Sequence, residues 1–333
     1  MNINDIAKLA GVSKSTVSRV INNKQEGMSE ETRNKISKII EEVGYIPNSM
    51  ARSITVSETK IIGVIIPDVE NPFFSQIVRG IEDYAVKKGY TVFLCNSDFN
   101  RKKEQNYLYS LLEKRVDGII LNTSGELDSV RLRELLYKSK LPIIVMDRKT
   151  NDFMNYPGVF INNEQAAYEG VSYLINKGNK NIVYLGGEKS VYTVQERYKG
   201  YLRAMGNAGL GIGKNSISYG KLSIESGYER TCKLLEEKAD IDAIFASADV
   251  IAIGALKAAR EYQIQIPDQI EIMGFDNINL CDIVTPTLST VGQPIYKIGE
   301  KSAKMLIDSI HNKDKVFEDV YLQTKLIIRQ STR

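Results

Sequence analysis

Short hydroxyl side chains and cations, with no acidic residue among them, are concentrated between residues 13 and 24 of the chain. Arginine can donate two hydrogen bonds to guanine, and hydroxyl and ammonium groups reach base edges or phosphates. The stretch is therefore a candidate DNA-reading surface, and the alternative interpretation is an ordinary solvated helix face. The candidate contact residues are Ser13, Lys14, Ser15, Thr16, Ser18, Arg19 and Asn22.

Two short helices are expected to position these residues. Asn2 can cap the first helix, with Asp5 completing a capping box, and apolar residues at helical spacing lead to a stop at Gly11. Ser13 caps the second helix, and the turn of residues 11–13 predicts the steep crossing of a helix-turn-helix. A third helix should begin at Ser29. The expected inner faces consist of Ile3, Ile6, Ala7 and Ala10, then Val17, Val20 and Ile21, then Ile36, Ile39, Ile40 and Val43, with Gly44 ending the third helix.

The segment that follows this headpiece has the character of a hinge. Pro47 favours an extended approach, and Asn48 can cap one or two turns of helix. The turns are too short, and too rich in Ser, Thr and Val, to be helical alone in water. We therefore expect three parts: residues 1–47 as the headpiece, 48–59 as a hinge helix and linker that forms on DNA, and 60–333 as the core.

The core alternates apolar strands with amphipathic helices, such as a helix from about Phe74 to Lys88. This pattern predicts parallel α/β sheets covered on both faces, and there are too many strands for one compact sheet. Two similar lobes are expected. The predicted strands are 60–67, 91–96, 118–122, 143–147, 182–186, 243–246 and 270–275.

Polar and aromatic side chains follow these strands. In open parallel sheets, ligands bind beyond the carboxyl ends of the strands. Amide and carboxylate groups there suit a small polar molecule such as a sugar, and phenyl rings suit its C–H faces. The alternative is that these residues cap the next helix, as Asp249 could. The residues are Asp68, Asn71, Phe73, Phe74, Asn96, Asp98, Asn122, Asp147, Arg148, Ser247, Asp249, Asp276 and Asn277.

The headpiece pattern D-I-A-x-x-A-G-V-S-x-x-T-V-S-R-V-I-N, then T-R and G-Y-x-P-N-x-x-A-R-S, resembles the lactose/galactose repressor (LacI/GalR) family. The similarity continues to residues 329–332. It implies a helix-turn-helix headpiece, a hinge helix and two Rossmann-like α/β lobes of the periplasmic-binding-protein type. By this resemblance Lys14, Ser15 and Arg19 contact bases, and Ile54 replaces a leucine that enters the minor groove. The other positions assigned to DNA or the hinge are Asn2, Asn22, Ser29, Thr32, Tyr45, Asn48, Ala51 and Arg52.

The same resemblance implies particular residues for a small-molecule effector. Arg197 and Asp276 match the family's effector-contacting arginine and aspartate, and Phe74, Asp147 and Thr193 match positions that line its pocket. Two departures disfavour a lactose-like inducer: Ala248 and Leu222 stand where the lactose repressor has asparagine and tryptophan. The partners implied are near-palindromic operator DNA, a sugar or sugar derivative, and a second copy of the chain in a homodimer.

The sequence gives little support for a catalytic, metal-binding or nucleotide-phosphate site. The single histidine, His311, lies in a polar segment, so no Ser-His-Asp or H-E-x-x-H arrangement can be built. Cys95, Cys232 and Cys281 are too far apart for a C-x-x-C zinc site, and residues 209–215 match neither phosphate-loop template. We expect no catalytic residue, cofactor or metal. The absence of a long apolar run or signal segment predicts a cytoplasmic protein.

The sequence therefore predicts a sequence-specific repressor of catabolic (carbohydrate) genes that is controlled by an effector in the interlobe cleft. The rival interpretations are a periplasmic-type ligand-binding protein and an enzyme on a Rossmann-like sheet. The missing signal segment and the headpiece disfavour the first, and the missing glycine fingerprint disfavours the second. The effector's identity, its sign of action, a tetramer and a protein co-effector are left open.

Overall fold

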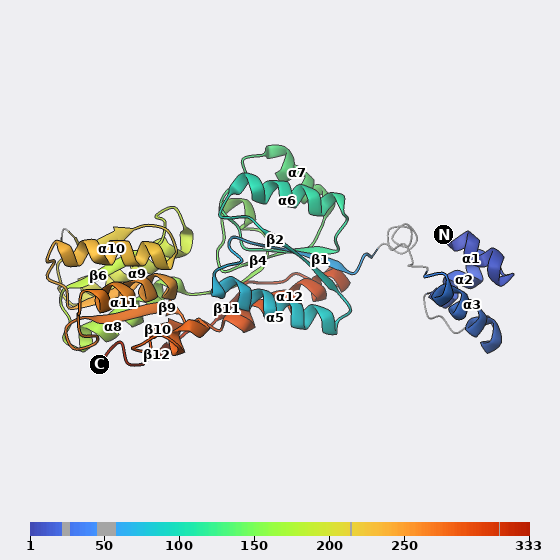
Figure 1. Cartoon of the computed structure of the whole chain (residues 1–333). Coiled ribbons are helices and arrows are strands. Elements are labelled where there is room, and N and C mark those ends of the chain that lie inside the picture. Colours follow the sequence, from blue (N-terminus) through green and yellow to red (C-terminus); the bar gives the residue numbers. More distant parts are fainter. Residues whose placement is uncertain (22–26, 45–57, 214, 313) are drawn as a thin grey trace. The chain divides into compact units, whose positions relative to one another are not determined.

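The computed structural model describes residues 1–21, 27–44, 58–213, 215–312 and 314–333. The chain divides into two compact units, Met1–Thr59 and Lys60–Arg333, and Figure 1 shows the elements of each. The smaller unit is helical. The larger unit holds two mainly parallel sheets, and it carries all of the strand-end residues considered above.

The described residues of the small unit form three helices around an apolar core: α1 (Ile3–Ala10), α2 (Lys14–Ile21) and α3 (Glu30–Glu42). Asn2 and Asp5 form the predicted capping box on α1, and Gly11 ends that helix with a φ of 68°. Such a φ strains a residue with a side chain, so glycine is favoured at this turn. Ser13 caps α2 through a bond from Thr16 N, and Ser29 caps α3 through one from Thr32 N. The core residues are Ile6, Ala7, Ala10, Val17, Val20 and Ile36.

The first sheet of the large unit defines lobe one. Its strand order is β11-β5-β4-β3-β1-β2, and all of its pairings are parallel. Figure 1 shows α6 and α7 on one face of the sheet and α5 and α12 on the other. The elements are β1 (Ile61–Ile66), α5 (Pro72–Lys87), β2 (Thr91–Asn96), α6 (Arg101–Glu113), β3 (Gly118–Leu121), α7 (Val130–Ser139), β4 (Ile143–Met146), η1 (Asn151–Phe153), β5 (Gly158–Ile161), α12 (Ile295–His311) and β11 (Val320–Leu322).

The second sheet defines lobe two and has the order β12-β10-β9-β8-β6-β7. Only the β10–β12 pair of this sheet is antiparallel. The elements are α8 (Asn163–Asn176), β6 (Ile182–Gly186), α9 (Tyr192–Asn207), β7 (Ile217–Tyr219), α10 (Ile224–Glu236), β8 (Ala243–Ala246), α11 (Asp249–Glu261), β9 (Glu271–Asp276), η2 (Asn279–Asp282), β10 (Ser289–Gly292) and β12 (Lys325–Ile327).

The chain passes between the lobes three times: from β5 to α8, from β10 to α12, and from β11 to β12. We call these segments the first, second and third crossovers. Three helix pairs, α5 with α12, α8 with α9 and α10 with α11, pack closely. Glycines permit this approach: a Cβ added at Gly299 would lie 2.0 Å from the Ile77 carbonyl oxygen.

The two-lobe α/β architecture was predicted correctly, and the strands at residues 91–96, 182–186 and 243–246 have the predicted bounds. The helix predicted from Phe74 begins two residues earlier, because Asn71 caps it and Pro72 fits its first turn. The strand predicted from Ile270 begins and ends one residue later. Among the described residues, no helix is both long and apolar enough to cross a membrane.

Candidate DNA-reading surface and ligand cleft

The exposed side of α2 displays the residues that the sequence assigned to base contact. Lys14, Ser15 and Arg19 are exposed, whereas Thr16 and Ser18 are half-buried beside the inward-facing valines. The first turn of α2 carries no acidic side chain. Because the N-terminus of a helix has a partial positive charge, this end of α2 attracts phosphate and is free of a competing carboxylate in its own first turn.

Hydroxyl groups organise the turn before α2. The Ser13 Oγ atom lies 2.7 Å from Ser15 Oγ and 2.8 Å from Thr16 Oγ1, both at hydrogen-bonding distance. Gly27, with a φ of 83°, leaves room for the Arg19 guanidinium, since a Cβ there would lie 2.6 Å from Arg19 Nη1. Of the other assigned DNA contacts, Asn2, Ser29 and Thr32 serve the helix caps, while Asn22, Tyr45, Asn48, Ala51, Arg52 and Ile54 lie outside the described residues.

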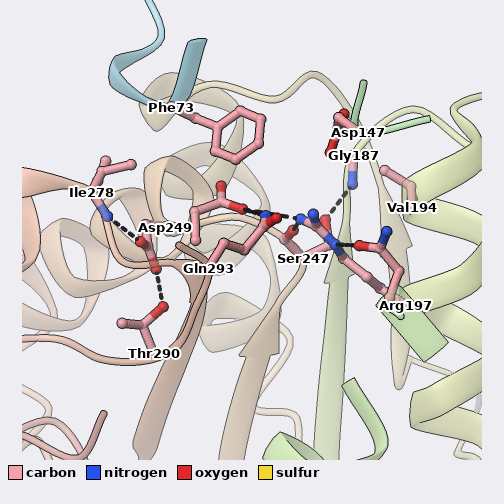
Figure 2. A network of polar contacts seen from close by, with 12 residues as sticks. Phe73, Asp147, Gly187, Val194, Arg197, Ser247, Asp249, Ile278, Thr290 and Gln293 are labelled. Carbon is pink, nitrogen blue, oxygen red and sulfur yellow. Dashed lines mark hydrogen bonds and ion pairs between the residues drawn. The ribbon is translucent and has the colours of Figure 1, made fainter. Parts of the chain in front are cut away.

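In lobe two, Arg197 lies at the centre of a buried polar network (Figure 2). Its Nε donates to Asn163 Oδ1 at 2.8 Å, and its Nη1 donates to the Ser247 carbonyl oxygen at 2.5 Å and to Asp276 Oδ1 at 3.4 Å. The guanidinium also lies 3.7 Å from the centre of the Phe275 ring. Packing on the ring and charge-assisted hydrogen bonds together fix the orientation of this arginine.

Asp276, at the end of β9, accepts two hydrogen bonds from Gln293. Its Oδ1 accepts from Gln293 Nε2 at 2.7 Å, and its backbone carbonyl accepts from Gln293 N. The φ of Asp276 is 123°, a conformation that strains a non-glycine residue. Burial raises the pKa of this carboxyl well above its usual value, while the charge of Arg197 opposes the shift.

Asp249 lies behind this turn and is fully buried. Its Oδ2 accepts from Ile278 N at 2.9 Å and its Oδ1 from Thr290 Oγ1 at 2.6 Å, as Figure 2 shows. Burial raises its pKa to about 6. Asp249 begins α11, but no side-chain cap bond is made there. Both oxygens are therefore occupied within lobe two, and the side chain supports the turn that follows β9.

In lobe one, Asp147 and Arg148 follow β4 and are buried. Asp147 has a φ of 65°, its Oδ2 accepts from Asn122 Nδ2 at 3.2 Å, and the same oxygen lies 3.5 Å from Arg148 Nε. Burial lowers the pKa of Arg148, and the charge of Asp147 opposes this shift. The Arg148 guanidinium lies over the Phe99 ring at 5.6 Å. Lobe one thus presents a fixed cation–carboxylate pair at its strand ends.

The remaining assigned effector residues are also buried. Asn71 caps α5 by accepting from Phe73 N at 3.0 Å, and Phe73 and Phe74 pack edge to face. Ser247 Oγ accepts from Gly187 N at 2.9 Å, which occupies one of its lone pairs. Thr193 lies in the first turn of α9. Helix capping thus accounts for the Asn71 side chain.

Several buried polar atoms at the strand ends have no hydrogen-bond partner within the described ranges. Such atoms are costly unless water or a ligand satisfies them. Three are acceptors, one is an arginine N–H and one is a hydroxyl: Asn122 Oδ1, Asp147 Oδ1, Gln293 Oε1, Arg148 Nε and Thr150 Oγ1.

Cavities lie between the two lobes, and Arg148, Thr150 and Asp147 are among the residues that line them. One of about 320 Å³ is lined by Asp68, Asp98 and Phe99 from lobe one and by Glu188 and Leu222 from lobe two. A second, of about 290 Å³, is lined by Phe99, Arg148 and Thr150 together with Glu188 and Tyr192. The interlobe space is large enough for a small polar molecule. Leu222, one of the two departures from the lactose repressor, lines the first cavity.

Sequence reasoning missed Asn163, Gln293 and Thr150. Asn163 and Gln293 follow β5 and β10, two strands that were not predicted, so neither residue was examined as a strand-end position. Recognising the short apolar run of β5 as a strand would have identified Asn163, whereas β10, with the sequence Ser-Thr-Val-Gly, offers no such apolar signal for Gln293. No group of three or more His, Cys, Asp or Glu side chains that could hold a metal occurs among the described residues.

Comparison with known proteins identifies the family. Residues 2–48 match the model for bacterial regulatory proteins of the lacI family, and residues 59–330 match that for periplasmic binding proteins and the sugar-binding domain of the LacI family. The chain belongs to the LacI family of transcriptional regulators. It is 38% identical to the ribose operon repressor of Halalkalibacterium halodurans, over 99% of this chain and 97% of that protein.

Solved structures of LacI-family members are similar to this chain in fold. A LacI-family regulator from Enterococcus faecium with bound ribose is 32% identical, covers 82% of this chain and 98% of its own, and superposes with a TM-score of 0.74. The lac repressor dimer bound to operator and an anti-inducer is 25% identical, with coverages of 100% and 99% and a TM-score of 0.86. The headpiece and the two lobes of this LacI-family regulator are therefore those of a DNA-binding transcriptional repressor with a ligand-binding core.

Proposed function

We propose that this regulator is a homodimeric repressor whose affinity for a near-palindromic operator is set by a neutral sugar, of the size of D-ribose, bound between its lobes. The observation that carries the proposal is the set of unpaired buried polar atoms at the strand ends, of which those on Asp147, Arg148 and Thr150 belong to residues that line interlobe cavities. A polar ligand bound between the lobes would supply hydrogen-bond partners for these atoms.

The chemistry of these atoms favours a neutral polyol. Three unpaired acceptors, on Asn122, Asp147 and Gln293, require hydrogen-bond donors from the guest, and sugar hydroxyls can donate. Arg148 Nε faces Asp147 Oδ2 only at 3.5 Å, and a sugar hydroxyl could accept from it as well. The carboxylate of Asp147 at the strand ends disfavours a phosphate group there. The ribose named for the H. halodurans and E. faecium relatives has this chemistry.

Operator binding is assigned to the headpiece. We propose that Lys14, Ser15 and Arg19 read base edges, because they are exposed on α2, whose first turn carries no acidic side chain. One headpiece reads one half-site, so a two-fold symmetric dimer requires a near-palindromic operator. Binding to chromosomal DNA would place the protein in the cytoplasm.

A homodimer is supported by an uncovered edge of lobe one. β2 ends the sheet, and Phe93 and Leu94 on it are 39% and 44% exposed. An apolar edge strand is a natural site for pairing with another chain, and native proteins seldom leave it open. The lac repressor dimer on its operator, which matches the whole chain, supports the same assembly.

The cleft is proposed to bind its ligand without converting it. The residues that line the interlobe cavities include no histidine or cysteine. The single histidine of the chain, His311, lies at the end of α12, where its Nε2 is 3.3 Å from the Tyr90 hydroxyl. The proposed role of the ligand is to favour one arrangement of the lobes over another, which changes operator affinity.

The proposal is tested with two binding measurements on the full chain. Titration calorimetry should detect D-ribose, but not ribose 5-phosphate or adenine, and Asp147→Ala should abolish the ribose signal. Selection from random DNA duplexes should enrich a near-palindrome whose affinity changes in the presence of D-ribose. Binding of ribose 5-phosphate in preference to ribose, or enrichment of no common sequence, would overturn the assignment.

A further inference from the structure

The first crossover between the lobes is tied directly to the arginine of the polar network. Asn163 is the first residue of α8, immediately after the chain leaves β5 of lobe one. Its side chain is 5% exposed, and its Oδ1 accepts from Arg197 Nε at 2.8 Å. Any reorientation of Arg197 must therefore move Asn163 or break this buried bond, which is costly when no other donor is available.

The second crossover is tied to the aspartate of the same network. Gln293 follows β10 immediately before Pro294 and α12, which returns the chain to lobe one. Its Nε2 donates to Asp276 Oδ1 at 2.7 Å, and its backbone N–H donates to the Asp276 carbonyl oxygen at 2.9 Å. The Ile295 N–H in turn donates to the Gln293 carbonyl oxygen. The start of α12 is thus tied to the end of β9.

Arg197 and Asp276 close the connection, because Arg197 Nη1 lies 3.4 Å from Asp276 Oδ1. A continuous series of buried contacts therefore runs from Asn163 through Arg197 and Asp276 to Gln293. We name it the crossover link. Two of the three connections between the lobes end on it, and its members are all at most 6% exposed.

We infer that the crossover link couples ligand binding to the lobe arrangement, and that Asn163 is the positioning residue that connects Arg197 to the first crossover. This inference rests on the proposed function. A sugar that engages Arg197 or Asp276 alters the bonds that these side chains make to both crossovers. Because the Oδ1 atom of Asn163 is occupied by Arg197, Asn163 acts through the arginine.

The first test measures coupling separately from affinity. Operator dissociation constants are compared with and without saturating D-ribose for the wild type, Asn163→Ala and Asn163→Asp, on the selected operator. Allosteric ratios are commonly about 5- to 150-fold. Asn163→Ala should bring the ratio close to 1 even at saturation, whereas Asn163→Asp, which keeps an acceptor for Arg197, should restore it. A role in ligand affinity alone would leave the saturated ratio unchanged and only raise the ribose concentration required.

The second test needs no ligand. Amide hydrogen exchange is followed in residues 289–298, at the second crossover, in the ribose-free protein. Asn163→Ala should accelerate exchange there, because the loss of one end of the crossover link loosens the other. Asn162→Ser is the matched control: Asn162 is adjacent and caps α8 by accepting from Gln165 N, a role that serine can also fill. It should leave both the exchange and the operator ratio as in the wild type.

The outcomes distinguish this inference from the proposed function. If wild-type operator affinity is indifferent to D-ribose, the sugar assignment is wrong, while exchange at the second crossover still decides whether the link exists. If Asn163→Ala leaves that exchange unchanged, or keeps the full operator ratio at saturating ribose, the coupling role of Asn163 is overturned.

Discussion

Arg19 combines an exposed guanidinium with a fixed backbone, because Val17 and Val20 on either side are buried in the headpiece core. Arg19→Ala should weaken operator binding by about 1–3 kcal/mol and relax the preference at one base pair. Fluorescence anisotropy on the operator and its single-base variants measures both effects.

Lys38→Ala is a matched control for the loss of one positive charge, since Lys38 lies on α3 and pairs with Glu42 at 3.8 Å. It should leave the base preference intact. If Arg19→Ala binds operator and scrambled DNA as the wild type does, α2 is not the reading helix.

Asp249 gives a pH-dependent test of its supporting role. Its pKa is about 6 in the folded protein against an ordinary value of 3.8. Between these values the folded chain keeps a proton that the unfolded chain has released, so the free energy of unfolding falls as pH rises through this window. The amide side chain of the Asp249→Asn variant cannot titrate. The stability of the wild type minus that of Asp249→Asn should therefore fall between about pH 4 and pH 6 and then level off. Thermal unfolding at several pH values measures it, and a flat difference would contradict the assignment.

At the scale of elements, close helix pairs stabilise each lobe from within. The Gly299 site on α12 leaves no room for a methyl group, because the Ile77 carbonyl oxygen of α5 would lie 2.0 Å away. Gly299→Ala should force the helices apart and lower the free energy of unfolding by about 1–3 kcal/mol.

Gly206→Ala on α9 provides the comparison, since no atom lies within 4 Å of an added Cβ there. Alanine suits a helix better than glycine, so this variant should be neutral or slightly more stable. Chemical denaturation of both variants tests the difference. Equal stabilities would show that the α5–α12 approach adapts without cost.

The long elements were predictable because their signals are local. Buried parallel strands appear as continuous apolar runs, and helix ends were marked by Asn2, Ser13 and Ser29, which do cap their helices. The five strands that were missed, β5, β7, β10, β11 and β12, have only three or four residues each. Their pairing depends on partners distant in the sequence, which a local pattern does not contain.

The candidate site was predictable only as a region. Polar residues after strands were correctly expected at the sheet edges. Their positions in the sequence do not reveal which hydrogen-bond partners each side chain has. Asp249 and Asp276 both lie at the carboxyl ends of strands in lobe two, yet both carboxylate oxygens of Asp249 accept hydrogen bonds from Thr290 and Ile278. Asp276 contacts Arg197 and Gln293. This difference between the two aspartates depends on residues that are distant in the sequence and meet only in the folded chain.

At the scale of the whole molecule, operator binding depends on assembly as well as on the lobes. A dimer presents two headpieces to one operator, and linking two binding modules can raise affinity by about 10²–10⁴-fold. Leu94→Glu places a charge on the exposed β2 edge, where it should oppose pairing of two chains. We expect sedimentation equilibrium to show a shift toward monomer and operator affinity to fall within that range.

Val316→Glu separates the effect of the β2 edge from a general effect of surface charge. Val316 is 87% exposed, outside any helix or strand, so the same substitution there should preserve both the dimer and operator affinity. If Leu94→Glu remains dimeric, the two chains meet through another face. If it becomes monomeric but still binds the operator as tightly as the wild type, one headpiece suffices and the palindromic operator is unnecessary. The lobes would then control the DNA binding of a single headpiece. The ratio of operator dissociation constants with and without saturating D-ribose should in that case be the same for the monomer and the wild type.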